Sequence, residues 1–266
     1  MTAPLPNVRK LFIPDPGYTI ADADLSGADA QVVAWEAEDA ELKQAFRDGL
    51  KVHILNCRTM FPALVKGWSD EAIKSHPIYK KNKQAVHATN YGAHFRTVAT
   101  TNGWTAAEAE NFQTRWFSAH PGIRRWHHRV EQSIRTKRMV ANKFGYTRTY
   151  FDRVDQLLPE GLAWIPQSTV ALVSFAGALN LKRNLPEVIM LIQVHDSLVF
   201  QYPTEREAEL LPKIKQELFT TVPYEDPLTI PWGLKTSTKS WGHCEDRKWP
   251  KIESNPGVVA ATTAPA

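Results

Sequence analysis

The chain has 266 residues, of which 43% are hydrophobic and 23% charged, and its formal net charge is +4. These values are typical of a soluble globular protein that is long enough to bury one large core or two smaller ones. The first ten residues lack the apolar region of a secretory signal and no apolar run approaches membrane-spanning length, so we expect a cytoplasmic protein without membrane contact.

The first half of the chain is predicted to be one strand followed by helices. Residues 1–17 form a proline-rich coil, and a strand ends near Asp24. Thr105 and Glu108 have the spacing of a capping box, which marks the start of a helix. In all, helices are predicted over residues 29–45, 52–60, 71–75, 79–97, 105–118 and 123–137.

The second half mixes strands and helices. It is predicted to contain a strand and turn over 142–150, a buried apolar helix over 161–181, a β-hairpin over 188–202, an amphipathic helix over 205–219 and a last strand over 228–235. Residues 255–266 are expected to be disordered. Strands near both ends with helices between them predict an α+β fold with an inserted helical subdomain.

Charge is distributed unevenly along the chain. Residues 124–148 carry eight bases and one acid, Glu131, with Trp126, His127 and His128 among them. A basic stretch interleaved with aromatic residues suits a polyphosphate backbone, and the alternative is a solvated helix face. Cys57 and Cys244, the only cysteines, lack metal-site spacing and fit a reducing compartment.

Two acidic residues lie at strand edges far apart in the sequence. Asp24 follows a strand-like run, and Asp196 lies at the turn of the predicted hairpin. Two carboxylates brought together by a sheet repel each other unless a cation lies between them. A few hard oxygen ligands suit Mg²⁺, so the pair predicts a two-metal site for phosphoryl transfer.

The segment 79–97 combines three functional side chains. Lys83, His87 and Tyr91 are spaced four residues apart and share one helical face, and Lys80 lies nearby. An ammonium group neutralises a triphosphate, and the rings pack against a sugar or base. The alternative is an ordinary amphipathic helix.

Eight segments, taken in chain order, resemble the motifs of the A-family DNA polymerases, the bacteriophage branch in particular. The resemblance covers residues 7 to about 242. The segments are Asp24-Leu25-Ser26-Gly27-Ala28-Asp29, His53, Lys83 with His87, Tyr91 and Gly92, Phe117 with Pro121 and Trp126, Phe144-Gly145-Tyr146-Thr147-Arg148, Pro166-Gln167-Ser168-Thr169, Gln193-Val194-His195-Asp196, and Trp241-Gly242.

The resemblance implies a partial right-hand polymerase fold with an antiparallel-sheet palm. Residues 1–35 and 123–250 would form the palm, 36–122 the fingers and 251–266 a disordered tail. Asp24, Asp196 and the Leu25 carbonyl would bind two Mg²⁺ ions, and Lys83 would stabilise the leaving group. The dNTP would contact Asp29, Lys80, Lys83, His87, Tyr91 and His53, and primer–template DNA would contact Arg148, Gln167, His195, Arg124, Arg125 and Arg129.

The chain departs from the family pattern at five positions, two of which are Leu25 in place of Tyr and Tyr79 in place of an Arg. Asp29 stands where the family has a Glu that blocks a ribose 2′-hydroxyl, Ser197 replaces a less essential Glu, and His87 replaces Phe or Tyr. In the family a thumb and an exonuclease domain precede the first palm motif, whereas here 23 residues precede Asp24. The chain is therefore either a fragment or one subunit of a split polymerase whose second polypeptide carries those domains, and we expect the second. If the protein is viral, it would be located in the host cytoplasm.

Two other functions remain open. One is a catalytically silent DNA-binding subunit of a replication complex, against which the intact Asp24 and Asp196 argue. The other is a metal-dependent nuclease, which also uses paired acids.

Overall fold

The computed structural model describes residues 7–151 and 157–250, which form two compact units. The sheet unit comprises Met1–Asp24, Ala176–Phe219 and Trp232–Ala266, and the helical unit comprises Leu25–Phe175 and Thr220–Pro231. These bounds differ from those of the palm and fingers inferred from the sequence, and the subdomain assignment stays a prediction.

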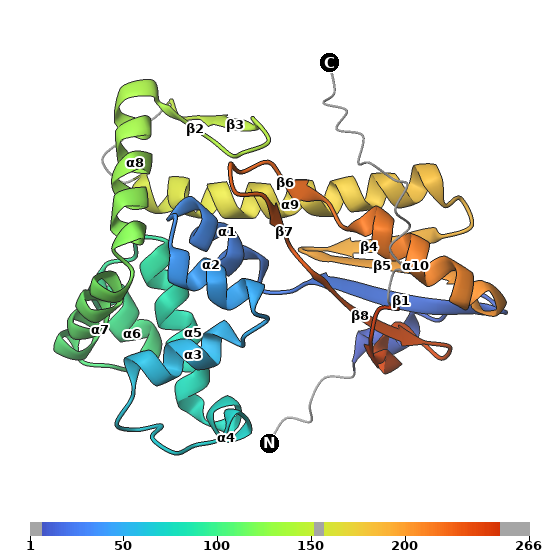
Figure 1. The fold of residues 1–266 in the computed structure, drawn as a ribbon, viewed down its shortest axis with the longest axis horizontal. Helices are drawn as coiled ribbons and strands as arrows, with labels where there is room; N and C mark the ends of the chain where they lie inside the picture. Colours follow the sequence, from blue (N-terminus) through green and yellow to red (C-terminus); the bar gives the residue numbers. More distant parts are fainter. Residues whose placement is uncertain (1–6, 152–156, 251–266) are drawn as a thin grey trace. The chain divides into compact units, whose positions relative to one another are not determined.

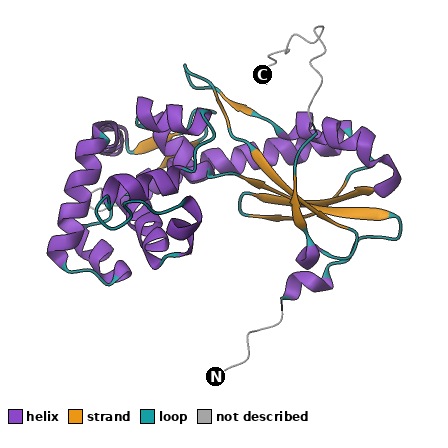
Figure 2. Cartoon of the chain, turned by 60° about the horizontal axis from the view of Figure 1, so that its bottom comes forward, coloured by secondary structure: helices purple, strands orange, loops and turns teal. Residues whose placement is uncertain are grey.

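The sheet unit is built on a five-stranded sheet of order β4-β5-β1-β8-β9 (Figure 1). Strand β1 pairs antiparallel with β5, which in turn pairs antiparallel with β4. Figure 2 shows helical segments on both sides of these strands. The elements are the 3₁₀ helix Val8–Leu11 (η1), β1 Tyr18–Leu25, β4 Ile189–Val194, β5 Ser197–Pro203, η3 Thr204–Arg206, α10 Glu207–Leu218, β8 Trp232–Ser237, η4 Trp241–His243 and β9 Glu245–Arg247.

The helical unit contains nearly all the helices. Its elements are α1 Ala28–Glu36, α2 Ala40–Arg47, α3 Val52–Met60, α4 Asp70–Ser75, α5 Pro77–Asn90, α6 Phe95–Asn102, α7 Ala106–Ala119, α8 Pro121–Lys137, β2 Met139–Ala141, β3 Thr147–Thr149, β6 Thr221–Val222 and β7 Leu228–Thr229. Helix α9, Leu158–Asn184, contributes its first part to this unit and its last part, from Ala176, to the sheet unit. The α+β class is therefore confirmed.

Local signals placed several helix ends correctly. Helix α3 spans the predicted residues, and Thr105 and Glu108 form the predicted capping box at the start of α7. The predicted helix 29–45 is instead two helices, α1 and α2. Glu38 has a left-handed backbone (φ 53°), and the Asp39 side chain caps α2 by accepting a hydrogen bond from the Leu42 amide.

The predicted helix 79–97 is also interrupted. Helix α5 ends at Asn90, Tyr91 is its C-cap, and α6 begins at Phe95. Gly92 lies between them with φ 73°, and a Cβ there would lie 3.0 Å from Leu162. The left-handed backbone at Gly92 ends the helical path of the chain, and glycine adopts this conformation without a steric cost.

Three further expectations were wrong in part. The last strand, 228–235, is two strands, β7 and β8, and β9 follows them. Trp126 is 1% exposed and packs in the core of the helical unit, so it is not part of a basic surface. The apolar helix α9 is not buried throughout, since Phe175 and Leu179 are about half exposed. The tail, 251–266, lies outside the described residues.

Helix α9 also corrects the expectation about apolar runs. Among the described residues it is the one helix long and apolar enough to cross a membrane, judged by length and composition alone. A helix in a protein core passes the same test, and Leu162, Val173 and Leu181 are fully buried.

Candidate active site

The sheet brings the two predicted metal-binding carboxylates together. In the antiparallel pairing of β1 with β5, Asp24 lies opposite Ser197, the residue directly after Asp196. The hairpin turns at His195 and Asp196, and His195 has a left-handed backbone with φ 54°. Histidine tolerates this conformation better than a β-branched residue does. The turn therefore presents Asp196 at the end of β1 that carries Asp24.

The electrostatics of Asp24 show that the carboxylates interact. The pKa of Asp24 is raised to about 6, first by partial desolvation and then by the negative charges of Asp196 and Asp22. The side chain is nevertheless open to solvent. An accessible carboxylate that repels its neighbours gains from a bound cation, which offsets the repulsion.

The donor set fits Mg²⁺. Among residues 7–151 and 157–250, no group of three or more His, Cys, Asp or Glu side chains is placed to hold a metal ion. Two carboxylates suffice for Mg²⁺, which keeps waters and takes phosphate oxygens as its other ligands. The Leu25 side chain is buried, so only its backbone is available for a ligand role.

Asp22 is a residue of this site that sequence reasoning missed. Its carboxylate accepts a hydrogen bond from the Ser197 hydroxyl and another, at 2.7 Å, from the indole N–H of Trp241. The signal was present in the sequence, because residues two apart in a strand point to the same face. Asp22 therefore faces the same side of the sheet as Asp24.

The helical unit holds the predicted nucleotide-binding side chains. Lys83 is exposed on α5, and within the described residues it has no ion-pair partner. Burial, and after it the charges of Lys83 and His87, lower the pKa of His53 to about 4. His53 is therefore neutral at physiological pH, and the cationic charge at this place belongs to Lys83.

His87 and Tyr91 lie against each other, as their four-residue spacing predicted. Their ring centroids are 4.4 Å apart, although Tyr91 caps α5 and does not continue it. Burial and the negative charge of Asp29 raise the pKa of Tyr91. Burial lowers the pKa of His87, and the charge of Asp29 partly offsets that decrease. Asp29, at the first turn of α1, is thus brought to both rings. Lys80 is exposed on α5.

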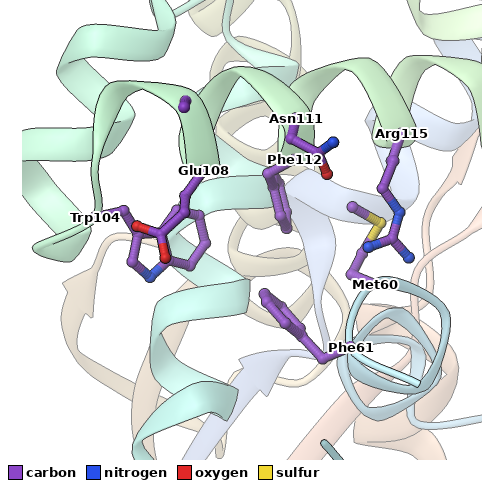
Figure 3. Close-up of a pocket in the computed structure, with 8 residues that line it drawn as sticks. Met60, Phe61, Trp104, Glu108, Asn111, Phe112 and Arg115 are labelled. Carbon is purple, nitrogen blue, oxygen red and sulfur yellow. The ribbon is translucent and has the colours of Figure 1, made fainter. Parts of the chain in front are cut away.

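The described residues of the helical unit line a cavity of about 320 Å³ beside Trp68 and His76, and two others. The larger, about 380 Å³, is lined by Met60, Phe61, Trp104, Ala107, Glu108, Asn111, Phe112 and Arg115 (Figure 3). None of the residues predicted to bind nucleotide or DNA lines it. The smaller, about 250 Å³, is lined by His53 together with Lys51, Val52, Ile54, Lys74 and Tyr79. The His53 ring thus borders a cavity, and its Nδ1 is buried without a hydrogen-bond partner.

The predicted DNA-binding arginines differ in how strongly they are already engaged. Arg124 and Arg125 are exposed on α8, and the Arg124 guanidinium lies 4.3 Å from the ring centroid of Phe117. Arg129 donates to the Glu36 carbonyl and lies 3.5 Å from Glu38, and Arg148 on β3 pairs with Glu160. Arg124 and Arg125 are therefore the more available pair. Gln167 and His195 are exposed on α9 and at the hairpin turn.

The chain is similar to bacterial and phage DNA polymerases. It is 27% identical over 236 residues to a thermostable DNA polymerase I of Thermus filiformis, covering 85% of this chain and 28% of that protein. A DNA polymerase of Mycobacterium phage D29 is 24% identical over 88% of this chain and 37% of its own length. The chain thus spans about a quarter to a third of these relatives.

A solved structure shares the fold. The POL domain of Pol1 from M. smegmatis, in complex with DNA primer-template and dNTP, matches with a TM-score of 0.77 at 19% identity, covering 89% of this chain and 42% of that one. This confirms the expected partial right-hand polymerase fold. The family model for DNA polymerase family A matches residues 2–243, so the chain belongs to DNA polymerase family A.

Proposed function

We propose that this chain is the catalytic part of a template-directed DNA polymerase, which adds dNTPs to a primer 3′-hydroxyl at a site with two Mg²⁺ ions. The observation that carries the proposal is the pairing of β1 with β5, which places Asp24 beside the turn that bears Asp196. The family membership supports the same reaction.

The residues divide the work by chemistry. Asp24 and Asp196 hold the ions, which when bound would activate the primer hydroxyl and neutralise the triphosphate. Lys83, which lacks a carboxylate partner in the described part of the chain, binds the triphosphate and stabilises charge on the leaving pyrophosphate. Asp29 and Tyr91 contact the nucleotide sugar. His195 and Gln167 contact the primer end, and Arg124, Arg125 and Arg148 contact backbone phosphates.

The deciding experiment measures nucleotide incorporation on a primer–template. Incorporation that follows the template base, requires Mg²⁺ and is lost in Asp24→Asn supports the proposal. Asp15→Asn is the matched control, since Asp15 is a carboxylate hydrogen-bonded to Gln201 elsewhere in the same unit. Degradation of DNA without incorporation would identify a nuclease, and binding with neither reaction would identify a silent subunit.

We also propose that the chain works with a second polypeptide. The support is a set of apolar side chains at the N-terminal segment of the sheet unit that are 45–80% exposed, namely Val8, Leu11, Phe12 and Ile13. Apolar side chains gathered in this way mark an interaction surface. With few phosphate contacts of its own, the lone chain should bind DNA weakly and extend primers distributively.

The second polypeptide is tested by co-purification from the native source, followed by mass measurement and primer extension with and without the partner. Leu11→Asp should prevent the association while leaving template-dependent addition by the lone chain unchanged. Processive synthesis by the lone chain would contradict the proposal.

Both cysteines are free thiols, which supports a reducing, cytoplasmic location.

A further inference from the structure

The Asp22 carboxylate connects three segments of the sheet unit that are distant in sequence. It lies on β1, accepts from Ser197 on β5 and accepts from Trp241 of η4. We propose that Asp22 is a positioning residue that holds the β4–β5 hairpin, and with it Asp196, in register with Asp24. The inference rests on the proposed function, because it assigns Asp22 a role in the metal site that Asp24 and Asp196 form.

The geometry follows from strand pairing. The register places Asp22 opposite Val199 and Asp24 opposite Ser197. Side chains directly opposite each other in an antiparallel pair point to the same face, so the Ser197 hydroxyl and both carboxylates of β1 share one side of the sheet. From there the hydroxyl reaches diagonally to Asp22 Oδ1.

Ser197 is the residue through which Asp22 acts. It begins β5 and follows Asp196 directly, after a turn in which His195 has a left-handed backbone. A hydrogen bond to a charged acceptor is among the stronger ones, so it fixes the start of β5 against β1 at the position adjacent to Asp196. Without it, the turn is held by the strand ladder and by the packing of Ile192 and Val194 on the apolar cluster that includes Trp241.

The other side of Asp22 is held by a packed anchor. Trp241 donates from its indole N–H to Asp22 Oδ2, and its backbone amide donates to the Phe12 carbonyl at 2.8 Å. Arg9 covers the indole at 4.5 Å from its centroid, and the ring packs with Ile20 and Val199. The acceptor position of Asp22 is therefore determined by the core of the sheet unit.

A carboxylate is required here for a simple reason. Asp22 receives two donors, one at each oxygen. Asparagine presents one oxygen, which accepts from Trp241, and one NH₂ group, which can only donate to the Ser197 oxygen, so a charge-assisted hydrogen bond is replaced by a weaker neutral one. Asp22 is a third carboxylate beside Asp24 and Asp196, so it adds repulsion that lowers the stability of the fold. An uncharged residue at this position would avoid that cost if the turn did not have to be positioned.

The test measures Mn²⁺ binding to the purified chain by water proton relaxation, without DNA or nucleotide. We expect Asp22→Asn and Ser197→Ala each to weaken binding about tenfold or more, the usual effect of removing a residue that orients a metal ligand. Ser197→Thr keeps the hydroxyl and should restore binding. Asp15→Asn removes a carboxylate that precedes β1 and accepts from Gln201 of β5 at 2.6 Å, and it should bind as the unaltered chain does.

The outcomes separate this inference from the proposed function. If Asp22→Asn and Ser197→Ala bind Mn²⁺ normally while Asp24→Asn does not, the positioning role is wrong and the metal site stands. If Asp24→Asn also binds normally, the metal site itself is wrong. If Asp22→Asn does not fold, the test relies on Ser197→Ala and Ser197→Thr. Weaker Mn²⁺ binding by folded Ser197→Ala than by folded Ser197→Thr supports the positioning role. Equal Mn²⁺ affinity of the two folded variants contradicts it.

Discussion

The carboxylate of Asp29 acts on the phenol of Tyr91, although one residue lies in the first turn of α1 and the other caps α5. Its negative charge adds to burial in raising the Tyr91 pKa. Asp29, which belongs to the first motif, thus lies near Tyr91, the aromatic residue of the fingers motif, within the helical unit.

This contact predicts how the chain selects sugars. Asp29→Ala should ease incorporation of ribonucleotides, because it removes the side chain beside Tyr91, and Asp29→Glu should keep or tighten their exclusion. The measurement is the ratio of kcat/KM for a dNTP and the matching rNTP. Equal ratios in all three proteins would show that Asp29 does not select the sugar. His87→Tyr should alter acceptance of 3′-deoxy nucleotides.

Asp24→Asn and Asp196→Asn should each abolish nucleotide addition while DNA affinity stays within about twofold, because each removes a charged metal ligand that contributes nothing to phosphate binding. Single-turnover incorporation and DNA titration check this. Retained addition in either variant would mean that the metal site lies elsewhere.

The pKa of Asp24, raised to about 6, predicts a pH dependence. At fixed Mg²⁺ the rate of addition should fall as the pH drops through about 6, because the protonated carboxylate is no longer a ligand. A higher Mg²⁺ concentration should move the midpoint to lower pH, since metal and proton compete. A midpoint that does not respond to Mg²⁺ would assign the titration to another group.

The same pKa has a consequence for stability. The folded-state pKa lies above the ordinary aspartate value of 3.8, so ionising Asp24 costs stability as the pH rises from about 3.8 through about 6. Asp24→Asn should therefore raise Tm relative to the unaltered chain at about pH 7.5 and have no effect near about pH 2.5, where Asp24 is protonated in both states. Thermal melts of the two proteins at both pH values check the sign.

Lys83→Ala should slow nucleotide addition at least about 100-fold, because a charge-assisted contact to a developing negative charge is worth about 3 kcal/mol. DNA affinity should barely change. Lys66→Ala, which removes another exposed lysine of the helical unit, is the control. If DNA binding falls instead of the single-turnover rate, Lys83 is a duplex contact.

Replacing both Arg124 and Arg125 with Ala should weaken DNA binding and make its dependence on salt shallower, by about 0.9 in log–log slope for each lost phosphate contact. Arg129→Ala should have the smaller effect, because that guanidinium already contacts Glu36 and Glu38. Titrations at several salt concentrations provide the slopes. Equal slopes in all variants would remove α8 from the DNA interface.

Much of the local structure could be predicted from the sequence. The capping box at Thr105 and the hairpin around His195 and Asp196 depend on short-range patterns, so they appeared where expected. The pair Asp24 and Asp196 was also identified, because each follows or interrupts a strand-like run. These features depend on side-chain spacing and turn chemistry, which a single chain displays directly.

Other features depended on contacts between distant segments. Helix α5 ends two residues before Gly92, where Leu162 approaches the backbone, and Trp126 is buried because it packs in the helical core. Asp22 was assigned no role from the sequence. Its role emerges only when β5 supplies Ser197 and η4 supplies Trp241. A carboxylate's function depends on which donors reach its two oxygens, and the pairing of strands, not their sequence, brings those donors there.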